Sequence, residues 1–132
     1  MVRKFSIPSV LMTLTLCVSI GFLTLTQTPV KAESLPQVPA PGLVTMVDLG
    51  AKKCIPCKMM APIIDELTKE YQGRAAVIFI DVWENSEAAP KFGIQTIPTQ
   101  IFYDAQGNEV ARHEGFLDKG AIVNMFTKLG VK

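Results

Sequence analysis

The stretch Lys53-Cys54-Ile55-Pro56-Cys57-Lys58 lies near the middle of the 132-residue chain and decides how the rest of it is interpreted. Two cysteines stand two residues apart, and a helical pattern of apolar residues begins immediately after them. A cysteine pair at this spacing can close into a disulfide across one turn of chain, or it can supply half of a metal site. The surrounding sequence has to decide between these two chemistries.

Apolar residues recur at helical spacing from Cys54 to Gly73, which predicts a helix whose first turn holds the cysteine pair. Almost continuously apolar runs at Leu43–Leu49 and Ala75–Val82 are typical of buried parallel strands. The later elements are expected to be a short helix over Asn85–Phe92 interrupted by Pro90, strands over Thr99–Tyr103 and Glu109–Gly115, and a last helix capped by Asp118. This order predicts an α/β fold with helices on both faces of a mixed sheet.

Residues 1–32 have the composition of an export signal. Arg3 and Lys4 precede the uncharged run Phe5–Thr26, and Val30-Lys31-Ala32 presents small or short residues where a signal peptidase cleaves. We expect cleavage after Ala32, with an uncleaved membrane anchor as the alternative because the apolar run has about the length of a bilayer span. The N-terminal charges favour the cytoplasmic side, so both alternatives place the remaining chain outside.

The rest of the chain divides into a proline-rich segment and one domain. Residues 33–42 hold three prolines and are expected to form an extended linker or an edge segment, followed by a domain over residues 43–132. Residues 33–132 carry 10 basic and 12 acidic residues, a net charge of −2, without a basic run that would indicate nucleic-acid binding. They keep only Cys54 and Cys57, which close too short a loop to stabilise a fold and therefore indicate redox chemistry.

The two cysteines are expected to differ in reactivity. Cys54 falls at the predicted helix start, where unpaired backbone N–H groups and the helix dipole favour an anion. Nearby positive charge comes from Lys52, Lys53 and Lys58. Both effects should lower the pKa of Cys54 below that of a free thiol and make its thiolate the attacking group. Cys57, one turn further along, should be more buried and remain a thiol until it is deprotonated.

Asp48 is the candidate acceptor for the Cys57 proton. It is a charged residue inside an apolar strand, six residues before Cys54. Burial of such a side chain is unfavourable unless it is satisfied or functional, and burial should raise its pKa towards the working range. The alternative is an aspartate at a strand end that faces water.

Four separated motifs, in order, give the chain a resemblance to the thioredoxin family. These motifs are Val47-Asp48, Cys54-Ile55-Pro56-Cys57-Lys58-Met59-Met60-Ala61-Pro62, Ala89-Pro90-Lys91-Phe92-Gly93-Ile94 and Ile97-Pro98-Thr99. The resemblance covers about residues 43–130 and implies the thioredoxin fold. It also implies that Cys54 is the nucleophile, Cys57 the resolving thiol and Asp48 the buried acid. Pro98 would be the cis-proline that faces the disulfide.

The chain departs from the family pattern at several positions. Lys53 stands where tryptophan is usual, Ile55 replaces the glycine between the cysteines, and Phe79 replaces a lysine commonly found near the buried acid. Because the segment before Asp48 is short, we expect the opening strand and helix of the family to be shortened or missing.

A substrate groove is expected around the cysteine pair. Ile55 and Pro56 would form its rim, Thr96 and Ile97 its opposite wall, and the Ile97 backbone could pair with an extended substrate segment. Trp83 follows the second parallel strand, at the sheet edge where ligand sites gather, and can either line this groove or serve ordinary packing.

The sequence therefore predicts an exported thiol–disulfide oxidoreductase, in a bacterial periplasm or anchored to the outer face of the inner membrane. Pro56 resembles the reducing members of the family, which favours a reductase of exported proteins. The resemblance implies an integral-membrane electron-relay partner, with cytochrome c maturation as one destination. We expect a monomer with no cofactor beyond the Cys54–Cys57 disulfide.

The sequence also allows two alternatives. One is a dedicated dithiol oxidant or isomerase. The other is a soft-metal carrier that uses Cys54, Cys57 and either His113 or Met59. Since His113 lies in an edge-strand pattern between two charged residues, we expect it to be an exposed strand residue and not a ligand.

Overall fold

The computed structural model describes residues 34–132, and the predictions for a signal or anchor in residues 1–32 lie outside this part of the chain. The described residues form an α/β fold in the predicted order of elements. They are β1 (Val44–Gly50), α1 (Ile55–Glu70), β2 (Ala75–Asp81), α2 (Ala88–Phe92), β3 (Thr99–Tyr103), β4 (Glu109–Glu114) and α3 (Lys119–Lys128).

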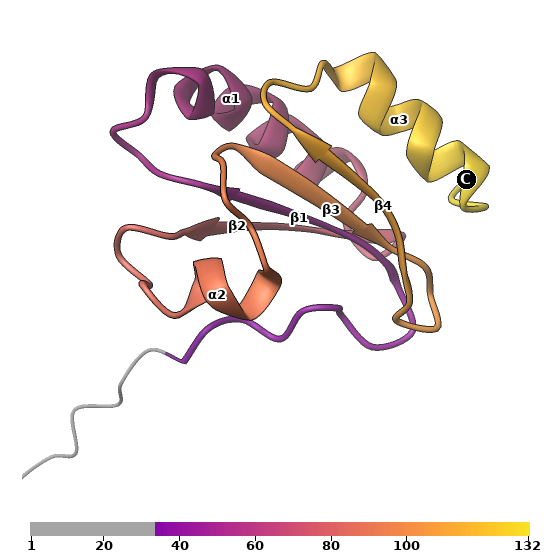
Figure 1. The fold of residues 1–132 in the computed structure, drawn as a ribbon. Coiled ribbons are helices and arrows are strands. Elements are labelled where there is room, and N and C mark those ends of the chain that lie inside the picture. Colours follow the sequence, from indigo (N-terminus) through magenta and orange to yellow (C-terminus); the bar gives the residue numbers. More distant parts are fainter. Residues whose placement is uncertain (1–33) are drawn as a thin grey trace, which may run out of the picture. The chain divides into compact units, whose positions relative to one another are not determined.

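The four strands form one mixed sheet in the order β2-β1-β3-β4. β1 pairs with β2 in parallel, and β3 is antiparallel to both β1 and β4. Helices α1 and α3 lie on one face of this sheet and α2 lies on the other (Figure 1). The predicted mixed sheet with helices on both faces is confirmed, and β1 holds a central position within it.

Side chains of β1 alternate between the two faces, which divides the core into two clusters. Met46 packs with buried residues of α1 and α3, including Met60 and Phe126. Val47 and Leu49 pack on the other face, in the cluster that includes residues of α2. Asp48 follows Met46 by two residues, so its side chain lies on the same face of the sheet and its carboxylate is directed towards α1.

The short helix α2 differs from the sequence prediction. We expected it to span Asn85–Phe92 with Pro90 as an interruption, but it begins only at Ala88. Pro90 therefore lies in the first turn, where a backbone N–H has no partner inside the helix and its loss costs little. Gly93 ends the helix in a left-handed conformation, with a φ angle of 61° that glycine adopts without strain.

Residues 34–42 contain no helix or strand, yet they contact the domain. Leu35 and Val38 pack against the cluster on the α2 face of the sheet. The Ala40 N–H also donates a hydrogen bond of 3.0 Å to Thr45 Oγ1 at the start of β1. This part of the segment expected to be a linker therefore follows the domain surface (Figure 1).

Within residues 34–132 no strand or helix precedes β1, in agreement with the expected loss of the opening elements. As a result, β2 forms one edge of the sheet. In the same part of the chain, no helix combines the length and apolar character needed to cross a bilayer.

Candidate active site

The two cysteines form a disulfide at the start of α1, with their Cα atoms 5.2 Å apart. Cys54 is the N-cap residue of the helix, and its sulfur accepts a hydrogen bond of 3.3 Å from the Cys57 N–H. Cys54 is half-buried, whereas Cys57 is only 4% exposed. Cys54 is therefore the sulfur that an incoming substrate can reach, and the helix N-terminus stabilises negative charge on it after reduction.

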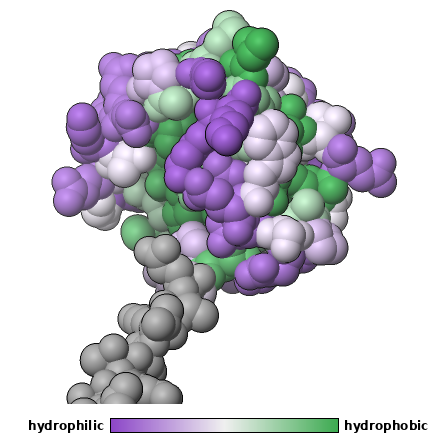
Figure 2. All heavy atoms as spheres, turned by 90° about the vertical axis from the view of Figure 1, so that its left-hand side faces the viewer, coloured by the Kyte–Doolittle hydropathy of each residue, from purple (hydrophilic) through white to green (hydrophobic). Residues whose placement is uncertain are grey.

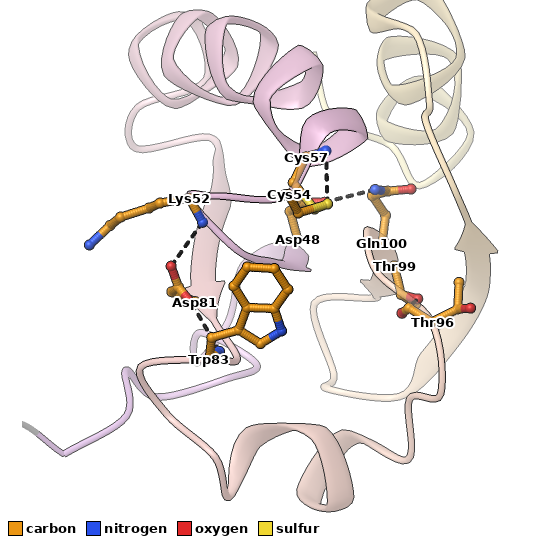
Figure 3. Close-up of a disulfide and its surroundings, with 9 residues drawn as sticks. All are labelled: Asp48, Lys52, Cys54, Cys57, Asp81, Trp83, Thr96, Thr99 and Gln100. Carbon is orange, nitrogen blue, oxygen red and sulfur yellow. Dashed lines mark hydrogen bonds between the residues drawn. A yellow bond between two sulfur atoms is a disulfide. The ribbon is translucent and has the colours of Figure 1, made fainter.

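Asp48 lies beneath the disulfide with a side chain that is 1% exposed (Figure 3). Its Oδ1 atom accepts a hydrogen bond of 2.7 Å from Gln100 Nε2. Burial raises the pKa of Asp48 to about 6, and the Gln100 hydrogen bond acts in the opposite direction by favouring the ionised form. A carboxyl group with this pKa can exchange a proton near neutral pH, as a general base requires.

Phe79 provides an apolar wall beside this carboxyl group. It is the register partner of Asp48 on β2. Together with Cys57 and Ile64 it lines a cavity of about 220 Å³ that also has charged residues at its rim. Gly50 lets Phe79 and Cys57 pack close to the backbone, because a Cβ atom at this position would stand 3.2 Å from Phe79 Cε2 and 3.3 Å from Cys57 Sγ. An aromatic ring thus occupies the position where the resemblance places a lysine.

The loop before β3 supplies the opposite wall. The Ile97–Pro98 peptide bond is cis, as the resemblance implies. The Thr99 hydroxyl donates to the Thr96 carbonyl at 2.7 Å, and the Gly115 N–H donates to the Pro98 carbonyl at 2.8 Å. Among residues 34–132, no hydrogen bond occupies the backbone N–H or carbonyl of Ile97. This backbone is therefore available to an extended peptide.

Three of the predicted groove residues are brought together by the fold. Trp83, Thr96 and Ile97 line one cavity of about 250 Å³ at the surface. Trp83 is 61% exposed, so it belongs to this wall and not to the core. Ile55, which follows the N-cap cysteine, is 77% exposed. On this end of the molecule, hydrophobic residues lie at the surface among hydrophilic ones (Figure 2).

Asp81 holds the turn after β2 in place next to the groove. Its carboxylate accepts backbone hydrogen bonds from Lys52, Trp83 and Glu84. Burial would raise the pKa of Asp81, but these N–H donors outweigh it and lower the pKa below its usual value. Lys52 also forms an exposed ion pair of 2.8 Å with Glu84. Part of the positive charge expected near Cys54 is therefore already matched by a carboxylate.

The residues proposed for a metal-binding alternative do not form a ligand set in the described part of the chain. His113 Nε2 lies 3.1 Å from the Phe116 carbonyl, at the surface of the β4–α3 connection. Met59 is exposed on α1. Within residues 34–132, no group of three or more His, Cys, Asp or Glu side chains is arranged to hold a metal ion.

Gln100 is the site residue that sequence reasoning missed. It is fully buried and pairs with Asp48 across the β1–β3 register. The available signal was its position, because Gln100 is an amide between Thr99 and the apolar run Ile101–Tyr103, within a predicted strand. Only the strand register shows that the two buried polar residues meet.

Comparisons with known proteins agree with this geometry. The family model described as Thioredoxin matches residues 33–128, which include both cysteines and Asp48. Thioredoxin of Pseudomonas aeruginosa is 39% identical over 77 residues, which make up 58% of this chain and 70% of that protein. Thioredoxin of Staphylococcus saprophyticus is 39% identical over 85 residues, 64% of this chain and 81% of that protein.

Solved structures show the same similarity. The structure of chloroplastic thioredoxin z superposes with a TM-score of 0.60 at 30% identity, covering 69% of this chain and 81% of that one. A structure described as that of a malarial protein has a TM-score of 0.59 at 27% identity, covering 65% of this chain and 96% of that one.

Proposed function

This chain belongs to the thioredoxin family, and on that premise we propose that it is an exported reductase of disulfides in other exported proteins. Its thioredoxin-like disulfide oxidoreductase activity follows from the family and from the Cys54–Cys57 disulfide at the start of α1. The observation that carries the thiol–disulfide exchange chemistry of this proposal is the difference in exposure between these two cysteines. One is reachable by a substrate, and the other is held back as the resolving group.

The reaction consumes the reduced cysteine pair. The Cys54 thiolate attacks one sulfur of a substrate disulfide, forms a mixed disulfide and displaces the other substrate sulfur as a thiolate. Cys57 then loses its proton to Asp48 and attacks the Cys54 sulfur. This step releases the second substrate thiolate and closes the Cys54–Cys57 disulfide. Two electrons have passed from the cysteine pair to the substrate.

The groove walls support an extended protein substrate. The Ile97 backbone presents an unpaired N–H and carbonyl, which can add a substrate segment as a short strand. Trp83 and Ile55, which directly follows Cys54, both offer exposed apolar surface. Backbone pairing with few side-chain requirements suits an enzyme that acts on several different disulfide proteins.

The proposed export rests on the sequence of residues 1–32. A reductase outside the cytoplasm needs electrons from across the membrane, so we propose an integral-membrane electron-relay protein as its reductant. Cytochrome c maturation is one process that could use these electrons. The intact mass of the exported protein tests the signal, because cleavage after Ala32 predicts a mature chain that begins at Glu33.

The equilibrium redox potential of the Cys54–Cys57 pair tests the reductive direction. Thioredoxin has a reduction potential of about −270 mV and the strong periplasmic oxidant one of about −120 mV. This difference corresponds to roughly 7 kcal/mol for two electrons. We expect a value close to the first, together with reduction of insulin disulfides by the purified protein. A potential above about −170 mV would instead support the oxidant or isomerase alternative. Cys54→Ser is the control and should not reduce insulin.

A further inference from the structure

We propose that Gln100 is a positioning residue that keeps Asp48 hydrogen-bonded in both of its protonation states, because its side-chain amide can turn with the proton. This inference rests on the proposed function, in which Asp48 accepts a proton from Cys57 and later releases it. The role of Asp48 itself follows from the family resemblance, whereas Gln100 enters only through the structure.

The geometry brings the amide and the carboxyl group into direct contact. Gln100 is the register partner of Asp48 across β1 and β3, and both side chains are directed to the α1 face of the sheet. Gln100 is 0% exposed, and its Nε2 atom lies 2.7 Å from Asp48 Oδ1. Two polar atoms of the pair, Asp48 Oδ2 and Gln100 Oε1, have no hydrogen-bond partner within the described residues.

The chemistry of an amide suits a carboxyl group that changes its charge. An ionised carboxylate only accepts hydrogen bonds, so it pairs with the amide nitrogen as observed. A protonated carboxyl group can donate from its O–H, and the amide oxygen can accept that proton. Rotation about the last side-chain torsion exchanges the amide nitrogen and oxygen within nearly the same volume. The unpartnered Oε1 atom is therefore the acceptor for the second state.

Other side chains in place of Gln100 would support only one state or neither. A lysine could only donate and would favour the ionised carboxylate, whereas an apolar residue would leave both states unsatisfied. On β2, the register partner of Asp48 is Phe79, whose apolar side chain cannot form such a hydrogen bond. Within residues 34–132, Gln100 supplies the side-chain hydrogen bond that Asp48 receives.

Other titratable groups around Asp48 must be held constant in a test. Cys57 and the rim residues Lys52, Lys58 and Asp65 line the cavity next to the disulfide. On the far side, His113 of β4 is the register partner of Gln100. A change confined to Gln100 leaves all five in place. Measurements on the oxidised protein remove the Cys57 thiol from the titration.

The first test replaces the amide by an apolar side chain of similar length, Gln100→Met, with the exposed Gln72→Met as the matched control. A hydrogen bond to a charged group is stronger than one to a neutral group, so its loss disfavours the ionised form. We expect the pKa of Asp48, followed by NMR of its labelled carboxyl carbon, to rise by about one unit. An unchanged pKa would overturn the positioning role. If Gln100→Met does not fold, Gln100→Leu replaces it.

The second test follows the amide itself. In the wild-type oxidised protein, the side-chain NH₂ resonances of Gln100 should titrate with the same midpoint as the Asp48 carboxyl group. Resonances that stay constant through this midpoint would show that the amide does not respond to the protonation of Asp48 and would overturn the turning of the amide.

The third test connects the pair to catalysis. Gln100→Met should move the pH profile of insulin reduction to higher pH, and it should leave the profile unchanged in an Asp48→Asn background. An equal change in both backgrounds would show that Gln100 does not act through Asp48. The NMR results do not depend on turnover, so a protein that fails to reduce insulin would contradict the proposed function and leave the role of Gln100 to be judged separately.

Discussion

At the scale of single residues, the site is organised by unequal burial. Cys54 caps a helix at the surface, Cys57 lies beneath it, and Asp48 lies deeper still on the central strand. This increase in burial matches the order of the reaction. Attack on a substrate disulfide requires an accessible Cys54, whereas proton transfer from Cys57 to Asp48 benefits from the exclusion of water.

The first prediction concerns the resolving step. Replacing Cys57 by serine removes the thiol that releases the substrate, so the Cys57→Ser variant should accumulate a mixed disulfide through Cys54. Affinity purification from cells under non-reducing conditions, followed by mass spectrometry, would show exported proteins bound to Cys54.

The matched control for this trap is Cys54→Ser, which keeps the buried thiol but removes the exposed one. It should capture no partner. Equal capture by both variants would contradict the assignment of Cys54 as nucleophile.

The second prediction is a pH dependence of stability that arises from Asp48. Its pKa rises from 3.8 to about 6 on folding because the carboxyl group is buried. The folded state therefore prefers the protonated form of Asp48. The contribution of this carboxyl group to the free energy of unfolding is fully present below about pH 4 and is lost as the pH rises through 6. The loss amounts to about 3 kcal/mol. Urea unfolding of the oxidised wild type and Asp48→Asn between pH 4 and 8 measures this difference.

Asp48→Asn should not show this loss, because an asparagine stays neutral over the whole range. The difference in free energy of unfolding between variant and wild type should therefore grow in favour of the variant from about pH 4 to 7. Asp65→Asn changes an exposed residue of α1 and serves as the control. A wild-type–Asp48→Asn difference that stays constant with pH would contradict the burial of an ionisable Asp48.

At the scale of secondary-structure elements, the helix starts are determined by side chains that replace missing backbone partners. Cys54 caps α1 with its sulfur, and Asp118 caps α3 with a carboxylate oxygen 3.0 Å from the Ala121 nitrogen. Helix α3 in turn covers the sheet with the buried residues Ile122 and Phe126. The cap at the start of α3 therefore affects the stability of the sheet face that carries Asp48.

The third prediction tests this cap. Asp118→Ala removes the hydrogen bond to the Ala121 N–H and should lower the free energy of unfolding by about 1 kcal/mol. Chemical denaturation at constant pH measures the change. Asp118→Ser keeps a side-chain oxygen that can accept the same bond and should retain most of the stability. A similar loss in both variants would show that the cap is not the cause.

At the scale of the whole molecule, the segment before β1 contributes to the core. Leu35 and Val38 pack against the α2 face, where Val47 and Leu49 of the central strand are buried. The sequence prediction treated residues 33–42 as a linker or an edge segment because of their prolines. Prolines prevent regular pairing there, but they do not prevent the apolar residues between them from contacting the sheet.

The fourth prediction follows from this contact. The double variant Leu35→Ser, Val38→Ser should lower the free energy of unfolding by about 2 kcal/mol, since each partly buried side chain contributes a fraction of its full burial energy. Thermal and urea unfolding measure it. Gln37→Ser, at an exposed position of the same segment, is the control. An unchanged stability of the double variant would mean that the segment is only a tether.

Particular residues show how far sequence reasoning reaches. Cys54, Cys57 and Asp48 could be identified from one strand and one helix, because their spacing and local polarity are unusual by themselves. The start of α2 could not be identified from the sequence, since Pro90 is compatible both with a break in a helix and with a position in its first turn. The partner of Asp48 could not be identified either, because Gln100 follows it by 52 residues and meets it only through strand register.

The Cys54-Ile55-Pro56-Cys57 stretch, its apolar helix and the buried strands around it determined by themselves the order of elements, and they favoured redox chemistry over metal binding. These features depend on local periodicity and on neighbours in the chain. The tertiary structure alone decided what surrounds the reacting groups. Sheet pairing places Asp48 beside Gln100 and Phe79, and loop packing places Trp83 and Ile97 around one cavity. Such contacts depend on register across the sheet, which no local pattern contains.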